Sequence, residues 1–240
     1  MFRVINPFVF GGGIWTPAVN GKMPVAAWVP GRDTAGNGTT TLTDLVGSND
    51  GALTNMDAVT DWVSDDGQYA LDFDGSNDRV DFGNVLATIF DSDFSISFWI
   101  KTSSTSGQIL IDKLGSIGFT SSLNSIGTGR FFLALRDGSG SHEIRTNSDS
   151  GVIDGGWHSV VYVFAGGNLS VLVDGVLQAA TVLVDTLSGS VANANSLCFG
   201  ARATIPTTIT FSGRSDDTRI WDQALDNTDI AALFAAGRGG

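Results

Sequence analysis

The chain has 240 residues, of which 31 are glycine and 15 phenylalanine, and a formal net charge of -12 at pH 7. A domain of this length buries a large core, whereas the acidity argues against phosphate-backbone binding, which depends on clustered lysine and arginine, so we expect no nucleic-acid partner. No stretch is long enough to span a membrane and the N-terminus lacks a signal-peptide pattern, so we expect no membrane insertion and synthesis in the cytoplasm without export.

Residues 1–24 differ in pattern from the rest of the chain. A short apolar run is followed by three consecutive glycines, Gly11 to Gly13, which suit a hinge. Loose aromatic side chains are costly in water, so we expect this segment to dock on the domain or on another subunit. An ordinary first strand paired within the domain is the alternative. The expected docking residues are Phe2, Phe8, Phe10 and Trp15.

Short strands are predicted along most of the remaining chain. The clearest is FSISFWIK at 94–101. One face of this run carries Phe94, Ile96, Phe98 and Ile100, and the other carries Ser95, Ser97, Trp99 and Lys101. Such alternation indicates a strand with one buried face. Further strands are expected at 69–73, 79–82, 108–113, 117–121, 130–136, 143–146, 157–164, 196–201 and 218–221.

The runs at 157–164 and 168–182 predict a three-stranded meander. Gly166 and Gly167 join the two runs, and the second is reversed at Asp174 and Gly175, a dipeptide that favours a tight hairpin turn. Many short strands with regular turn signals predict an all-β fold of two antiparallel sheets packed as a sandwich. The single cysteine, Cys198, lies in an apolar run and is expected to pack as a small hydrophobe.

One short helix is predicted near the end of the chain. Asp226 takes the N-cap position and Asp229 the third helical position of a capping box. An apolar stripe at helical spacing follows, and Gly237 is a suitable stop. We expect this helix to close the sandwich.

Five segments, in this order, carry a resemblance to a known family. They are DLVGSNDGALT (44–54), LDFDGSNDRVDFG (71–83), FSISFWIKT (94–102), GGWHSVVYVFAGGNLSVLVDGVLQ (155–178) and FSGRSDDTRIWDQALDNTDIAALFAAG (211–237). With them the chain resembles the laminin-G-like jelly rolls of the concanavalin A-like lectin and glucanase superfamily. The resemblance implies a two-sheet jelly-roll sandwich at 25–240, preceded by the segment 1–24. Its function stays open, since such sandwiches include enzymes, lectins and structural modules.

The aspartate-rich turns are candidate calcium sites. Every acidic residue except Glu143 is aspartate, whose short side chain suits both turns and hard cations. The tetrapeptide GSND occurs twice, at 47–50 and 75–78, and the resemblance implies calcium near such turns. Alternatively, these residues only hydrogen-bond the turn backbone. The expected metal ligands are Asp74, Asn77 and Asp78, with Asp216 and Asp217 from the closing segment.

Catalytic residues are not expected. Glycoside hydrolysis needs two carboxylates about 5 to 10 Å apart. The related glucanases place two glutamates in one strand, which a chain whose single glutamate is Glu143 cannot supply. Neither His142 nor His158 lies near the motif of a nucleophilic serine. We therefore expect no enzymatic activity.

These observations favour a non-catalytic structural or adhesion module. We expect a bacteriophage virion surface protein, either a capsid decoration or a tail protein, which its N-terminal segment anchors to other virion proteins or to a second copy. The alternative is a carbohydrate-binding lectin, calcium-dependent or not, that attaches to a cell-surface glycan. A glycoside hydrolase ranks third.

Overall fold

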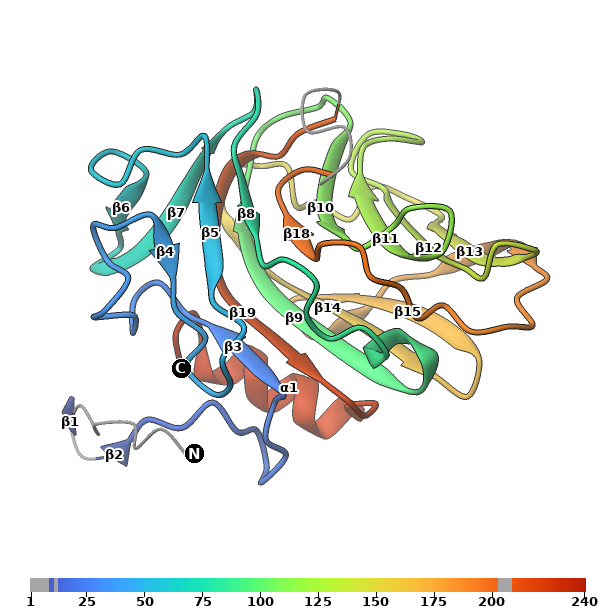
Figure 1. Cartoon of the computed structure of the whole chain (residues 1–240), viewed down its shortest axis with the longest axis horizontal. Helices are drawn as coiled ribbons and strands as arrows, with labels where there is room; N and C mark the ends of the chain where they lie inside the picture. The colour runs from blue at the N-terminus through green and yellow to red at the C-terminus, as the bar shows by residue number, and fades with distance from the viewer. Residues whose placement is uncertain (1–8, 11–12, 203–208) are drawn as a thin grey trace.

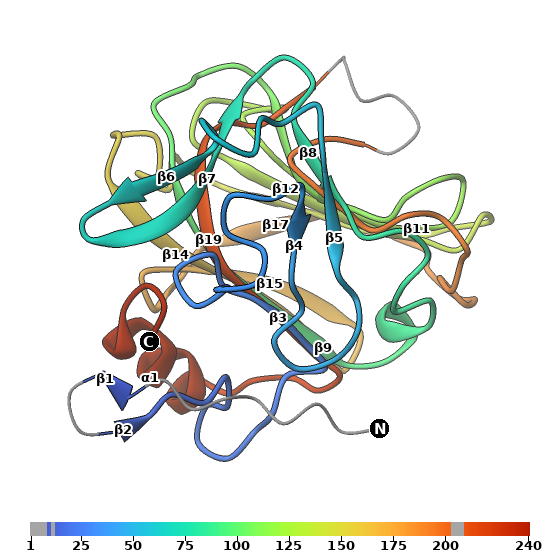
Figure 2. The ribbon, with the colours of Figure 1, turned by 60° about the vertical axis from the view of Figure 1, so that its left-hand side comes forward.

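Two antiparallel sheets pack face to face in the computed structural model, which describes residues 9–10, 13–202 and 209–240 (Figure 1). One sheet has eight strands and the other nine. The helix α1 (Asn227–Ala236) lies outside the eight-stranded sheet, and Figure 2 shows the β1–β2 pair (Val9–Phe10 and Gly13–Ile14) on the same side. The predicted class, all-β with one short C-terminal helix, is confirmed.

The eight-stranded sheet contains the longest strands. In spatial order they are β16 (Val176–Leu177), β15 (Asn168–Val173), β14 (Trp157–Ala165), β9 (Phe94–Lys101), β19 (Ser212–Trp221), β7 (Gln68–Asp74) and β6 (Trp62–Asp65), with β3 (Ala26–Trp28) paired to β19.

The nine-stranded sheet faces it across the core. Its order is β17 (Ala180–Asp185), β13 (Ser141–Thr146), β12 (Phe131–Arg136), β11 (Gly118–Leu123), β10 (Gln108–Asp112), β18 (Cys198–Phe199), β8 (Arg79–Asp81), β5 (Gly51–Thr54) and β4 (Thr41–Leu42). A short 3₁₀ helix, η1 (Ile89–Asp91), precedes β9.

Alternating apolar residues fill the space between the sheets. In β9, the four residues Phe94, Ile96, Phe98 and Ile100 are 0% exposed, and the bounds of this strand are those predicted. The Tyr162 ring of β14 lies 5.1 Å from that of Phe98, measured between centroids. Because a fully buried large apolar side chain stabilises by about 1.5 to 3 kcal/mol, this layer holds the two sheets together.

The predicted helix and its capping box are confirmed. The Asp226 carboxylate accepts hydrogen bonds from the backbone N–H groups of Thr228 and Asp229, and the Asp229 carboxylate accepts one from Asp226 N. Ile230 and Leu233 pack on outward-facing residues of β14 and β15. The helix therefore covers part of the outer face of the eight-stranded sheet.

The predicted meander is only partly correct. β14, β15 and β16 are consecutive in one sheet, but β16 ends at Leu177. After Gln178 and Ala179 the chain crosses to the other sheet, where β17 pairs with β13. The apolar run at 176–184 is thus shared between two sheet edges, which strand periodicity alone does not distinguish. The strands β3 to β6, in the N-terminal third, were not predicted as strands.

Trp15 packs on this chain itself. Its indole Nε1 donates a hydrogen bond to Gly240 O at 3.0 Å, and the guanidinium groups of Arg32 and Arg219 lie 5.7 and 5.8 Å from its ring centroid. Phe2 and Phe8 lie outside the described residues, and Phe10 is described only as part of β1. Anchoring of a second molecule by this segment therefore stays a prediction.

Residues before the predicted boundary at 24 also contact the domain. The Lys22 ammonium lies 2.5 Å from an Asp229 carboxylate oxygen, and Asn20 Nδ2 donates to the other oxygen at 3.0 Å. Trp221 Nε1 donates to Lys22 O. The segment from Trp15 to Lys22 is therefore a covering layer on α1 and β19. Among the described residues, no helix has the length and hydropathy of a membrane span.

Candidate functional site

Four neighbouring strands bring polar side chains into one row on the outer face of the eight-stranded sheet. Trp157 of β14 lies opposite Lys101 of β9, which lies opposite Arg214 of β19. Arg214 in turn lies opposite Asp72 of β7. Directly opposed residues of antiparallel strands point to the same face. Since the neighbouring Ile100 is part of the core, this row faces outward.

Ion pairs hold the cations of this row in place. Lys101 Nζ lies 3.0 Å and Arg214 Nη1 2.5 Å from Asp65 Oδ2, on the β6–β7 hairpin. Arg214 Nε also lies 3.6 Å from Asp72 Oδ2. Burial raises the pKa of Asp65, but hydrogen bonds from Arg214 and Lys101 outweigh it and lower the pKa overall. Asp65 is therefore ionised at neutral pH and positions both cations.

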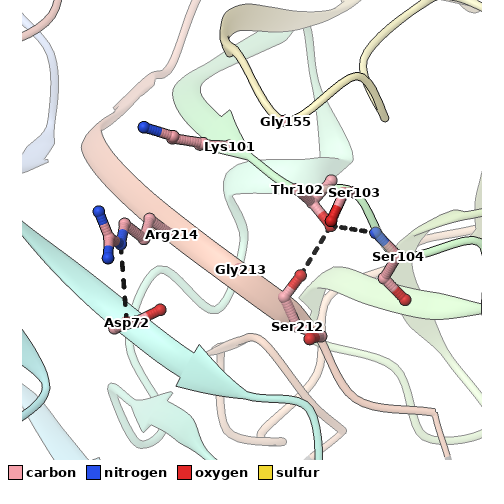
Figure 3. A pocket seen from close by; sticks show the side chains of 9 residues that line it. All are labelled: Asp72, Lys101, Thr102, Ser103, Ser104, Gly155, Ser212, Gly213 and Arg214. Atoms are coloured by element: carbon pink, nitrogen blue, oxygen red, sulfur yellow. Dashed lines mark hydrogen bonds and ion pairs between the residues drawn. The ribbon is translucent and has the colours of Figure 1, made fainter.

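A polar pocket of about 400 Å³ opens beside the row (Figure 3). It is lined by residues 101–104, Gly155, residues 212–214 and Asp72. Thr102 organises its floor, because its Oγ1 donates to Ser212 O at 2.7 Å and accepts from Ser104 N at 3.1 Å. The lining offers ammonium, guanidinium, hydroxyl and carboxylate groups together, which suits a ligand with several hydroxyl groups.

Gly213 allows the two central strands to approach each other at this pocket. Its φ is 138°, a conformation that other residues rarely adopt, and a Cβ there would lie 2.3 Å from Lys101 O. A side chain at this position would therefore push β19 away from β9. The glycine of the closing FSGR motif has a direct role in forming the pocket wall.

The C-terminal segment closes the row next to Trp157. The Arg238 guanidinium lies 4.2 Å from the centroid of the Trp157 ring, and Arg238 Nη1 lies 3.3 Å from Asp216 Oδ2. Burial and the neighbouring Asp217 charge raise the pKa of Asp216 to about 8. Because a cation covers one face of Trp157, that face is not available for stacking on a sugar.

The expected metal ligands of the β7–β8 turn bond the turn itself. Asp74 Oδ1 accepts from Ser76 N at 2.7 Å, and Asp78 Oδ2 accepts from Asp74 N at 2.9 Å. Asn77 O accepts from Asn55 Nδ2. Burial raises the pKa of Asp78 to about 6. These bonds are those of the alternative reading, in which the residues form a turn.

Asp216 and Asp217 do not join that turn. In the register of β19 and β7, Ser212 lies opposite Asp74, while Asp217 binds the Arg219 guanidinium at 2.6 Å. The structure thus divides the five expected ligands between two places. Within the described part of the chain, no group of three or more His, Cys, Asp and Glu side chains has the geometry of a metal site. Calcium at the turn stays a prediction.

The histidines and the cysteine have structural surroundings. His158 contacts Asp174 through Nδ1 at 2.8 Å and Asp154 through Nε2 at 3.0 Å. Burial lowers the pKa of His158, but these two bonds outweigh it and raise the pKa overall. Cys198 is fully buried, and burial raises the pKa of its thiol to about 12. A thiol in this state is a poor nucleophile.

The chain belongs to the concanavalin A-like lectin/glucanases superfamily, since the Laminin_G_3 family model matches residues 74–231. The resemblance stated from the five motifs is confirmed. A comparison with curated proteins gives no match.

Solved structures of low sequence identity share the fold. The receptor-binding domain of botulinum neurotoxin C/D mosaic serotype has a TM-score of 0.63 at 15% identity, covering 89% of this chain and 51% of its own. The ligand-binding domain of botulinum neurotoxin serotype D, in complex with N-acetylneuraminic acid, has a TM-score of 0.63 at 16% identity, covering 89% of this chain and 51% of its own. Trypanosoma rangeli sialidase has a TM-score of 0.61 at 14% identity, covering 88% of this chain and 32% of its own. The chain spans between a third and about half of these structures, and the likeness shows the fold alone.

The pocket was not predicted from the sequence, although one signal was present. Lys101 ends an alternating strand on its outward side, and its register partner Arg214 follows the glycine of the FSGR motif. Two outward cations on unrelated segments become neighbours only once the pairing of β9 with β19 is known. The sequence carries no local mark of that pairing.

Proposed function

We propose that this protein is a non-catalytic carbohydrate-binding module, with the pocket beside Lys101 and Arg214 as its binding site. The carrying observation is the row of fixed charges next to four hydroxyl side chains in one pocket of about 400 Å³. Sugar hydroxyls both donate and accept hydrogen bonds, so they match a lining of mixed donors and acceptors. Asp65 fixes the two cations before any ligand arrives, which reduces the ordering cost of binding.

The carboxylates of the pocket support a binding role over hydrolysis. Among the lining residues, Asp72 is the single carboxylate, and Asp65 behind it is occupied by two cations. Glycoside hydrolysis by the usual route needs a second carboxylate that faces the scissile bond. The pocket therefore offers recognition without an acid and base pair.

The superfamily supports the carbohydrate ligand. One structural neighbour is described in complex with N-acetylneuraminic acid, and another is a sialidase. The virion role expected from the sequence has no further support, and whether the protein works on a phage particle is a separate question. A cell-surface glycan is the proposed class of ligand.

A glycan array, probed in calcium and in chelator, tests the proposal. Ser103 is exposed and lines the pocket, so Ser103→Trp should fill the pocket without disturbing the core. Thr105→Trp, at an exposed position of the same loop outside the lining, is the matched control. We expect a defined set of glycans to bind, Ser103→Trp to lose about tenfold or more in affinity, and Thr105→Trp to bind as the unchanged protein does.

Three results would count against the proposal. Silence across the array removes the carbohydrate function, and equal binding by Ser103→Trp removes the pocket as its site. Release of reducing sugar from a bound polysaccharide contradicts the non-catalytic part. Loss of binding in chelator would return a calcium ion to the site.

A further inference from the structure

A second row of polar side chains crosses the outer face of the nine-stranded sheet. Successive register pairs join Asp81 of β8 to Cys198 of β18, Cys198 to Asp112 of β10, and Asp112 to Thr120 of β11. The neighbours of these residues in sequence, such as Val80 and Phe199, belong to the core. The row therefore faces away from the eight-stranded sheet and from the pocket described above.

Unpartnered polar atoms gather on this face. In the described part of the chain, seven buried side-chain nitrogen or oxygen atoms have no hydrogen-bond partner, and five of them lie here. Two belong to nearly inaccessible side chains, Asp112 at 1% and Thr120 at 2% exposure. A buried polar group left unpaired is destabilising, so such groups are rare and call for an explanation. The five atoms are Arg79 Nε, Asp112 Oδ1, Thr120 Oγ1, Arg145 Nε and Arg202 Nε.

Two of these arginines lie near a carboxylate without a hydrogen bond to it. Arg79 Nε is 3.7 Å from Asp81 Oδ2, and Arg202 Nε is 3.7 Å from Asp112 Oδ1. Burial raises the pKa of Asp112, while Arg202 and the nearby Thr120 hydroxyl act in the opposite direction. An incoming oxyanion can therefore gain the guanidinium donors without first breaking a hydrogen bond.

Four arginine side chains and three carboxylates share this face. We call it the arginine face, and it carries four of the ten arginines of the chain, whose net charge is -12. One of them, Arg136, is fully engaged, because its Nε and Nη2 donate to Glu143 at 3.2 and 3.0 Å. The other three keep an unpartnered Nε. The arginine face comprises Arg79, Arg136, Arg145 and Arg202 around Asp81, Asp112, Thr120 and Glu143.

The three arginines with an unpartnered Nε are spread across the sheet. Arg79 lies on β8 and Arg145 on β13, which are separated by five strand spacings in the sheet order. At 4.8 Å per spacing their backbones are about 24 Å apart. Phe132, partly exposed and opposite Arg145, adds an apolar surface between them. This spacing suits an extended ligand with repeated anionic groups better than a single small ion.

We propose that the arginine face binds an extended saccharide that carries oxyanion groups, either carboxylate or sulfate. Arg79, Arg145 and Arg202 donate to the oxyanions, since a guanidinium matches them in a fork geometry. The three carboxylates on the face disfavour a uniformly charged phosphate backbone. This site is separate from the pocket and does not depend on it.

Calorimetric titration of the full chain tests the proposal. The probes are short and long oligomers of galacturonic acid, sulfated heparin-derived oligomers, neutral oligomers of galactose, and single-stranded DNA. We expect affinity for one of the two acidic classes that increases with oligomer length, and none for the neutral oligomers. The acidic class that binds identifies the oxyanion as carboxylate or sulfate.

Variants locate the site. Arg145→Gln should weaken binding about tenfold or more, because it removes a charged hydrogen-bond donor to the oxyanion. Arg136→Gln removes the same charge from an arginine that is already paired, and it should change affinity by less than about threefold. Thermal melting checks that both variants fold. Ser103→Trp in the pocket should leave this binding unchanged.

The proposal is overturned by any of four results. These are no binding of either acidic class, equal binding of single-stranded DNA, equal losses in Arg136→Gln and Arg145→Gln, and loss of binding in Ser103→Trp. The third result would identify bulk electrostatic attraction. The fourth would move the acidic saccharide to the pocket and leave the carbohydrate function itself intact.

Discussion

At the scale of single residues, the dominance of aspartate over glutamate has a structural reason. Asp33 accepts hydrogen bonds from Gly36 N and Thr43 N, and Asp44 accepts them from Ala27 N and Val46 N. The carboxylate of aspartate is close enough to its own backbone to satisfy such turn donors, whereas glutamate carries one more methylene. These aspartates therefore form turns, and calcium at the β7–β8 turn stays a prediction.

The two GSND segments share one kind of hydrogen bond. Asp50 accepts from Asp44 N at 2.8 Å, as Asp78 accepts from Asp74 N at 2.9 Å. In each turn the last aspartate closes a loop on the backbone of an earlier one. The repeated tetrapeptide thus makes the same type of bond in two loops of different length, 44–50 and 74–78.

Asp78→Asn should change how stability depends on pH. The folded carboxyl holds its proton to about pH 6, whereas the unfolded one releases it near 3.8. The folded state therefore loses stability relative to the variant as pH rises from about 4 to 6, by about 1 to 2 kcal/mol after allowance for solvent screening. Urea denaturation between pH 4 and 6 measures this difference in the free energy of unfolding. Asp222→Asn, at an exposed position, is the control. Parallel curves for unchanged protein and Asp78→Asn would contradict the assignment.

Gly213→Ala should destabilise the protein by more than about 2 kcal/mol, because the added Cβ would meet Lys101 O at 2.3 Å in a strained backbone conformation. Gly107→Ala is the matched control, since a Cβ there would make an ordinary contact of 3.5 Å with Ser125. Chemical denaturation compares the two. If both variants lose the same small amount, β19 adapts and the glycine is not needed for the pocket wall.

At the scale of elements, the capping residues of α1 stabilise the helix and also join it to the rest of the domain. Asp226 bonds two helical N–H groups, while Asp229 binds both the cap and the Lys22 ammonium. The helix start is therefore joined to the N-terminal segment and to the outer face of the sheet. An isolated helix of ten residues is marginal in water, so these contacts and the apolar side of α1 hold it.

Asp226→Ala should lower the free energy of unfolding by about 1 kcal/mol, within the range of 0.5 to 2 kcal/mol known for N-caps. Asn227→Ala, at the exposed first helical position, should change it by less than about 0.5 kcal/mol. Thermal and urea denaturation measure both. Equal stability of the two variants would show that the capping box contributes nothing measurable here.

The elements that could be predicted are those with a strong local pattern. The strand at 94–101 has clear alternation, and α1 has its cap, its apolar stripe and its stop in sequence. The short strands β3 to β6 lack such a pattern, because pairing partners far along the chain define them. The end of β16 and start of β17 likewise depend on which sheet edge is free.

At the scale of the whole molecule, the C-terminal segment ties the outer row to the buried charges of β19. Arg238 contacts Asp216, the Trp157 ring and the backbone of Asp65. These contacts come from three different strands of one sheet. Loss of Arg238 would leave Asp216 buried without this cation.

Arg238→Met should therefore destabilise by about 1 to 3 kcal/mol, because the buried Asp216 carboxyl, whose raised pKa keeps it largely protonated at neutral pH, loses a hydrogen-bond partner. The double variant Arg238→Met, Asp216→Asn should recover much of this loss, with a coupling energy of about 1 to 3 kcal/mol. A double-mutant cycle in urea measures the coupling. Additive effects of the two substitutions would show that this pair does not act as a unit.

The fold was predictable from five short motifs, but neither candidate site was. Lys101 with Arg214 and Asp81 with Cys198 each come from segments far apart in sequence, and strand pairing alone brings them together. The metal residues were expected from composition and resemblance, and register separates Asp74 from Asp216. A motif identifies a strand, whereas a site on a sheet is a property of neighbouring strands.

The two proposed sites lie on opposite outer faces of one sandwich, so each side of the molecule has its own binding surface. A glycan in the pocket and an acidic saccharide on the arginine face would be held on opposite sides of a single chain, about the thickness of two sheets apart. One such molecule would act as a crosslinker between two glycan-coated surfaces without any need to dimerise.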